Sequence, residues 1–101
     1  MFRICYADLA KAFKNKDLKR RPVVVIKDLG RKVVVLKITG RSINDKYHVR
    51  MNHFLIYGFC DVGNIYTIDK KYILSYVRDC TTSEVESIKI NLKNFQKSID
   101  I

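Results

Sequence analysis

The stretch "KRRPVVVIKDLGRKVVVLKITG", Lys19–Gly40, contains two apolar runs on either side of a single turn signal. The runs Val23–Lys27 and Lys32–Ile38 are rich in β-branched residues, which favour strands. Between them, Asp28-Leu29-Gly30-Arg31 supplies the Asp and Gly that favour turns. The stretch therefore predicts an antiparallel hairpin, and the rest of the fold is built outward from it.

The length of the turn decides which arginine faces Thr39 at the open end of this hairpin. A two-residue loop at Leu29-Gly30 places Arg20 opposite Thr39, whereas a three-residue loop with a left-handed glycine places Arg21 there. In both registers a guanidinium group and a hydroxyl meet, and Pro22 holds Arg21 in an extended conformation. Such a pair suits a phosphate, although solvated strand ends also carry arginine. The basic residues around it are Lys19, Lys37 and Arg41.

Further strands are predicted on both sides of the hairpin. Residues 4–7 form a short first strand, and residues 8–21 are lysine-rich and predict an ordered or mobile surface loop. Residues 46–52, "KYHVRMN", alternate with a period of two, which places Tyr47, Val49 and Met51 on one face and His48, Arg50 and Asn52 on the other. Residues 63–68 predict another strand, and residues 72–77 a strand or a helical turn.

The C-terminal segment predicts a helix over about residues 82–97. Thr81 followed by Glu84 is a capping-box pattern, which satisfies the free N–H groups that open a helix. The apolar stripe along this helix consists of Val85, Ile88, Leu92, Phe95 and Ile99. We expect the stripe to pack on the sheet of the same chain; pairing of two chains is the alternative. The fold class is therefore mainly β with a C-terminal helix, a small barrel or curled sheet in one domain of residues 1–101.

The charge of the chain is strongly one-sided. The net charge is +10 over 101 residues, and residues 1–52 hold 14 Lys and Arg against four Asp and Glu, while residues 53–101 hold six of each kind. A one-sided positive field attracts a polyanion, for which nucleic acid is the first candidate, ahead of an anionic membrane surface or an acidic protein.

The three cysteines do not form a pattern that binds zinc or builds a disulfide framework. Cys5, Cys60 and Cys80 are odd in number, widely spaced and without a CxxC pair, which fits a reducing cytoplasm. The apolar runs are much shorter than the roughly 20 residues that a membrane helix needs, and the N-terminus does not read as a signal peptide. We expect a cytoplasmic protein.

The hairpin motifs resemble those of a known family. "KRRPVVVIKD", then "VVVLKIT", an Asp-x-Tyr segment and a strand ending "NIYTID" are similar to the MazF/PemK toxin endoribonucleases of type II toxin–antitoxin systems. The resemblance covers roughly residues 4–95 and is most specific at Arg21-Pro22 and at Lys37-Ile38-Thr39. It implies an SH3-like small β-barrel, a homodimer, an acidic antitoxin as protein partner, and cleavage of single-stranded RNA without a metal or other cofactor.

The resemblance also implies residue roles. Arg21 matches the arginine that stabilises the pentacoordinate phosphorane, and Thr39 matches the hydroxyl that positions the scissile phosphate. The reaction implied is attack by the ribose 2′-OH, which gives a 2′,3′-cyclic phosphate. The residues expected to bind the RNA around this catalytic pair are Lys19, Arg20, Lys37, Arg41, His48 and Arg50.

Several alternatives stay open at this point. The general base is not identified; the candidates are His48, His53, Asp8 and Asp45. Phe13, alone in the lysine-rich segment, either stacks on a base or covers the open end of the barrel. The whole chain could instead be a non-catalytic SH3-like nucleic-acid-binding module, or a basic domain that binds an acidic protein.

Overall fold

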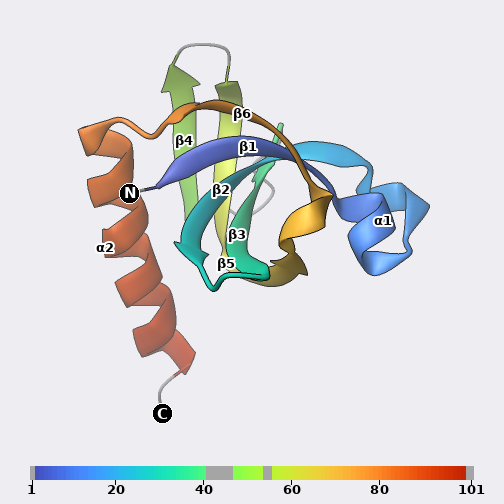
Figure 1. Cartoon of the computed structure of the whole chain (residues 1–101). Coiled ribbons are helices and arrows are strands. Elements are labelled where there is room, and N and C mark those ends of the chain that lie inside the picture. The colour runs from blue at the N-terminus through green and yellow to red at the C-terminus, as the bar shows by residue number, and fades with distance from the viewer. Residues whose placement is uncertain (1, 41–46, 54–55, 100–101) are drawn as a thin grey trace.

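The computed structural model describes residues 2–40, 47–53 and 56–99, and these form six strands and two α-helices (Figure 1). The strands are β1 (Arg3–Asp8), β2 (Arg20–Asp28), β3 (Lys32–Thr39), β4 (His48–His53), β5 (Ile56–Asp69) and β6 (Ile73–Asp79). The helices are α1 (Leu9–Phe13) and α2 (Thr82–Ile99), with single 3₁₀ turns at η1 (Lys16–Leu18) and η3 (Lys70–Tyr72).

All six strands belong to one antiparallel sheet in the order β4-β5-β3-β2-β1-β6. The sheet is curled, so that β1 and β6 run at a steep angle to β4 and β5 (Figure 1). The described ladders leave β4 and β6 as the two ends of the sheet. The expected class, mainly β with a C-terminal helix, is confirmed. For residues 72–77 the sequence left a strand or a helical turn open. The structure contains both, a helical turn at η3 followed by the strand β6.

The β2–β3 hairpin forms as predicted, but by neither of the predicted loops. The Leu29 N–H donates to the Lys32 carbonyl at 2.8 Å, so the two residues at the tip are Gly30 and Arg31, with Gly30 at φ +93°. A bulge at Ile26 then adds one residue to β2. The turn and the bulge together place Val23 opposite Lys37.

Strand alternation divides the buried side chains between the two faces of the sheet. We call the face against α2 the helix side; its cluster contains Ile4, Val24, Leu36, Ile38, Val49, Met51, Ile56, Cys60, Val62, Cys80 and Ile88. We call the other face the open side; its cluster contains Cys5, Ala7, Leu9, Val23, Val25, Val33, Val35 and Ile68.

The stripe on α2 packs against β4 and β5, as predicted for all but its last residue. Ile88 is fully buried, and Val85, Leu92 and Phe95 are partly buried against the helix-side cluster. The prediction was wrong for Ile99, which is 61% exposed because it lies at the last residue of the helix.

The capping box of α2 is confirmed and includes an arginine that the sequence pattern did not indicate. The Thr81 N–H donates to Glu84 Oε1 at 2.8 Å, and the Glu84 N–H donates to Thr81 Oγ1 at 3.1 Å. Arg78 of β6 donates to both carboxylate oxygens of Glu84, at 2.7 and 2.9 Å. Burial raises the pKa of Glu84, but the hydrogen bonds from Arg78 and Thr81 outweigh it and leave this pKa below its ordinary value.

The lysine-rich segment is more structured than a surface loop. Asp8 caps α1 by accepting the Lys11 N–H at 3.0 Å, and the Lys19 carbonyl accepts from the N–H groups of Leu9 and Ala10. Leu9 is 1% exposed and belongs to the open-side cluster, so the expectation that none of this segment is core was wrong. The short helix is therefore anchored by one buried apolar residue and by hydrogen bonds to the backbone N–H groups of its first turn.

Candidate functional site

A row of side chains crosses three neighbouring strands on the open side, at the open end of the hairpin. Thr39 of β3 lies opposite Phe59 of β5, and Phe59 lies opposite Arg50 of β4. Directly opposed residues of an antiparallel ladder point to the same face. Their neighbours in sequence, Ile38 and Cys60, are buried in the helix-side cluster, which places the row on the face away from α2.

Arg21 extends this row onto β2. Its backbone pairs with Ala7 of β1. The described β2–β3 ladder ends at the pair Val23–Lys37, and the same register continued by two residues would bring Arg21 opposite Thr39. Arg21 is half-buried, and its Nε donates to the Leu18 carbonyl at 3.1 Å. Within the described residues its two terminal amino groups have no hydrogen-bond partner, so they can donate to a bound anion.

The backbone of Thr39 is held in place by Gly58. A Cβ atom at position 58 would lie 2.5 Å from the Thr39 carbonyl oxygen, and Gly58 has φ +129°. Only glycine adopts this conformation without strain and permits this approach of β5 to the end of β3. A side chain at position 58 would therefore push the end of β3, and with it Thr39, away from β5.

The other basic side chains expected at the site differ in their exposure and in whether they already pair with a group of the protein. Arg20 is paired with Asp8, whose Oδ2 lies 3.5 Å from Arg20 Nε, although 70% of the Arg20 side chain is exposed. Lys19 and Arg50 are exposed and Lys37 is half-buried opposite Val23. Arg41 lies outside the described residues.

His48 shares the face of Arg50, as strand alternation predicted, but its ring is not on the surface. Only 10% of its side chain is exposed, and His48 Nε2 lies 3.5 Å from Asp61 Oδ1 on the neighbouring strand. The ring centroid is 6.1 Å from that of Phe59. Asp61 and Phe59 thus lie beside the imidazole and cover most of it.

The remaining candidates for the general base are not brought into the row by the described structure. Both oxygens of Asp8, which is 5% exposed, are engaged by α1 and Arg20. Asp45 lies outside the described residues, and of His53 the structure describes only the backbone, at the end of β4.

Phe13 packs on the protein itself. Its ring lies 5.2 Å from that of Tyr66, centroid to centroid, with the two planes tilted by 54°. Tyr66 packs against the open-side cluster, so Phe13 covers this side of the sheet while 39% of it stays exposed. This contact fits the covering role, one of the two that the sequence left open.

Two aromatic residues of β5 were not among the site residues that the sequence predicted. Phe59 stands in the row, half-buried, and Tyr57 is 69% exposed. The signal was present in the alternation of residues 56–62, where Ile56 and Cys60 are buried on the helix side. Without knowing that β5 is one continuous strand, this alternation could not be followed past Gly58.

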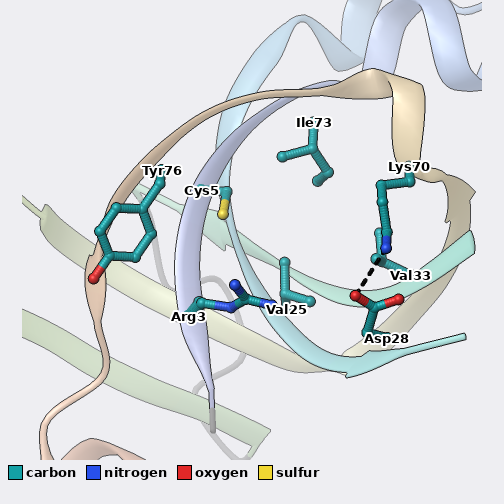
Figure 2. Close-up of a pocket in the computed structure, with 8 residues that line it drawn as sticks. All are labelled: Arg3, Cys5, Val25, Asp28, Val33, Lys70, Ile73 and Tyr76. Carbon is teal, nitrogen blue, oxygen red and sulfur yellow. Dashed lines mark hydrogen bonds and ion pairs between the residues drawn. The ribbon is translucent and has the colours of Figure 1, made fainter. Parts of the chain in front are cut away.

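A shallow pocket of about 290 Å³ lies elsewhere on the sheet, near the tip of the hairpin (Figure 2). Lys70 Nζ and Asp28 Oδ2 form an ion pair of 2.9 Å at its edge. The residues that line it are Arg3, Cys5, Val25, Asp28, Val33, Lys70, Ile73 and Tyr76. None of these was predicted as a site residue.

The three cysteines are free and buried, and burial raises the pKa of the Cys80 thiol to about 12. Among the described residues no group of three or more His, Cys, Asp and Glu side chains is placed to hold a metal ion. In the same part of the chain, no helix has the length and apolar character needed to cross a membrane.

Comparison with known proteins identifies the fold. No protein-family model and no curated protein sequence matches the chain. Solved structures do match: toxin MazF-mt6 of Mycobacterium tuberculosis has a TM-score of 0.77 at 17% identity, covering 94% of this chain and 96% of that chain. MazF of Deinococcus radiodurans has a TM-score of 0.78 at 11% identity, covering 94% and 93%.

A third match is an endoribonuclease from Mycobacterial species in complex with its cognate antitoxin, with a TM-score of 0.77 at 18% identity, covering 94% of this chain and 91% of that chain. These likenesses extend over nearly the whole length of both partners, and they agree with the six-stranded sheet and terminal helix described above. The chain therefore has the fold of the MazF toxins.

Proposed function

We propose that this chain is the toxin of a toxin–antitoxin pair and an endoribonuclease that cleaves single-stranded RNA without a metal ion. The observation that carries the proposal is the register of the β2–β3 hairpin, which pairs Val23 with Lys37 and, continued by two residues, would bring Arg21 opposite Thr39. The fold shared with endoribonucleases and the positive charge of the first half of the chain support the same function.

The chemistry follows from the two groups at this end of the hairpin. The Thr39 hydroxyl and the Arg21 guanidinium hold the scissile phosphate, while the adjacent ribose 2′-oxygen attacks phosphorus. The bond from phosphorus to the 5′-oxygen breaks and a 2′,3′-cyclic phosphate remains. The 2′-hydroxyl loses one proton and the 5′-oxygen takes up one, so the reaction consumes no net proton. Because the nucleophile belongs to the substrate, the protein aligns the reacting atoms and stabilises the charge that develops on the phosphoryl oxygens.

The first test is cleavage of a long unstructured RNA in the presence of EDTA. We expect products with a 2′,3′-cyclic phosphate and a free 5′-hydroxyl. Arg21→Ala and Thr39→Val should each lower the single-turnover rate by about 100-fold or more, which is typical for loss of a preorganised donor. Arg31→Ala is the matched control, because it removes an exposed arginine from the other end of the same hairpin and should leave the rate unchanged.

Two results would contradict the proposal. RNA binding without any cyclic-phosphate product would mean a nucleic-acid-binding module that has the fold but not the reaction. Full cleavage by folded Arg21→Ala would mean that the reaction occurs at another place on the molecule.

The proposed protein partner is an acidic antitoxin, and the proposed assembly of the toxin is a homodimer. An acidic chain complements the 14 Lys and Arg of residues 1–52. Size-exclusion chromatography with light scattering measures the dimer directly. If the neighbouring gene encodes a small acidic protein, production of the two chains together should yield a complex that no longer cleaves RNA.

A further inference from the structure

Tyr57 and Phe59 of β5 belong to neither of the two hydrophobic clusters that the described residues form. On this strand, Ile56 and Cys60 are 2% and 0% exposed and belong to the helix-side cluster. Tyr57 and Phe59 alternate with them and therefore point to the open side. Tyr57 is 69% exposed, the highest exposure among the large apolar side chains of the described residues.

These two residues lie beside the groups assigned to the phosphate. Phe59 is directly opposite Thr39 on one neighbouring strand and Arg50 on the other. Arg50 is exposed, and two strand spacings of about 4.8 Å separate its backbone from that of Thr39. An aromatic ring thus stands between a hydroxyl that holds one phosphate and a cation that can reach the next.

The ring of Phe59 is also supported from the side. His48 lies 6.1 Å away, centroid to centroid, with the ring planes tilted by 32°, and Asp61 holds the imidazole at 3.5 Å. A platform that must stack on a base gains from such support, because less side-chain freedom is lost on binding.

We propose that Tyr57 and Phe59 form a stacking platform for two successive nucleobases of the single-stranded RNA, next to the phosphate held by Arg21 and Thr39, with Arg50 at the following phosphate. Aromatic side chains two residues apart on an exposed strand are separated by about 6.8 Å, and sheets that present such aromatics beside cations bind single-stranded nucleic acid in this way. The identity of the ligand rests on the function proposed above; the placement of the platform does not.

The experiment measures binding with an RNA that cannot react. The oligonucleotide carries a 2′-deoxyribose at the scissile position and 2-aminopurine at the following one, so that stacking on a ring is read as a change in fluorescence. We expect Phe59→Leu and Tyr57→Leu to weaken binding by about tenfold each and to reduce the fluorescence change. Phe59→Trp should restore both, because it returns a flat ring to the same position.

Tyr76→Leu serves as the control. Tyr76 is 59% exposed but lies on β6, at the opposite edge of the sheet from β4 and β5, so its loss should not change binding. An abasic site in place of 2-aminopurine completes the design: it should weaken binding to the wild type and leave binding to Phe59→Leu unchanged.

Equal loss of affinity on abasic substitution in the wild type and in both leucine variants would overturn the proposal. So would leucine variants that bind RNA normally but lose self-association, because Tyr57 and Phe59 would then lie in an interface between two copies of the chain. None of these measurements requires cleavage. If the chain binds RNA in the expected pattern but does not cut it, the proposed function is wrong while the stacking platform is still supported.

Discussion

Gly58 shows at the scale of one residue how the backbone constrains the candidate site. A side chain there meets the Thr39 carbonyl at 2.5 Å, and the backbone has φ +129°. We predict that Gly58→Ala lowers stability by about 1 to 3 kcal/mol, because strain of this kind costs that much, and that it lowers RNA cleavage further by moving Thr39. Thermal unfolding and single-turnover cleavage measure the two effects separately.

Gly40→Ala is the matched control for this prediction. Within the described residues, and apart from its neighbours in the chain, no heavy atom lies within 4 Å of the position that its Cβ would occupy. It should leave both quantities nearly unchanged. If Gly58→Ala behaved like Gly40→Ala, the contact with Thr39 would not position the hydroxyl.

At the same scale, sequence reasoning named the residues of the proposed phosphate site but did not foresee their surroundings. The hairpin predicted an arginine, Arg20 or Arg21, beside Thr39, and the family resemblance selected Arg21. The enclosure of His48 by Asp61 could not be foreseen, since it depends on which residue of β5 lies opposite each residue of β4. Strand pairing over a distance is not encoded in local alternation.

At the scale of the element, α2 depends on the ion pair that joins its first turn to β6. The side chains of Arg78 and Glu84 are 10% and 9% exposed. We predict that Glu84→Gln destabilises the protein by about 3 kcal/mol at pH 7, because it leaves a buried guanidinium without its carboxylate. Chemical denaturation gives the free energy of unfolding.

The same substitution should change the response to acid. The pKa of Glu84 is below its ordinary value of 4.5 in the folded chain, so its stabilising effect is complete above that value and is lost as pH falls through the lower, folded pKa. The difference in stability between wild type and Glu84→Gln should therefore shrink in acid. Glu86→Gln, an exposed change on the same helix, should give a small difference at every pH. A constant difference down to pH 3 would argue against the ion pair.

The capping box and the apolar stripe made α2 the most predictable element, since both signals are local. The segment of residues 8–21 was the least predictable one. Its helix is five residues long and is held by the Lys19 carbonyl, a contact that no spacing of residue types reveals.

At the scale of the whole molecule, the uneven charge predicts how RNA affinity depends on salt. Each phosphate contact on a single strand contributes about 0.7 to the slope of log K against log salt. Replacing Lys11, Lys14 and Lys16 by Gln should reduce the slope by about 2, if each contacts one phosphate. Fluorescence anisotropy over a range of salt concentrations measures the slope.

The control for this experiment removes the same charge from the helix side. Lys89, Lys93 and Lys97 are exposed on α2, and their replacement by Gln should leave the slope nearly unchanged. Equal slopes for the two triple variants would mean that total charge, and not its placement beside the hairpin, attracts the RNA.

The bulge at Ile26 affects two properties of the hairpin, the pairing register of its strands and their local twist. Past the bulge the pairs Val25–Val35 and Val23–Lys37 follow one another without interruption, and the pairs before it are fixed by the Gly30-Arg31 turn. A chain lacking only Ile26 could keep every one of these pairs and still lack the local twist that a bulge adds. The pairing register of the hairpin and the local twist of its strands therefore depend on different residues of β2. A substitution at the bulge could change the shape of this surface without moving the proposed pair, Arg21 and Thr39.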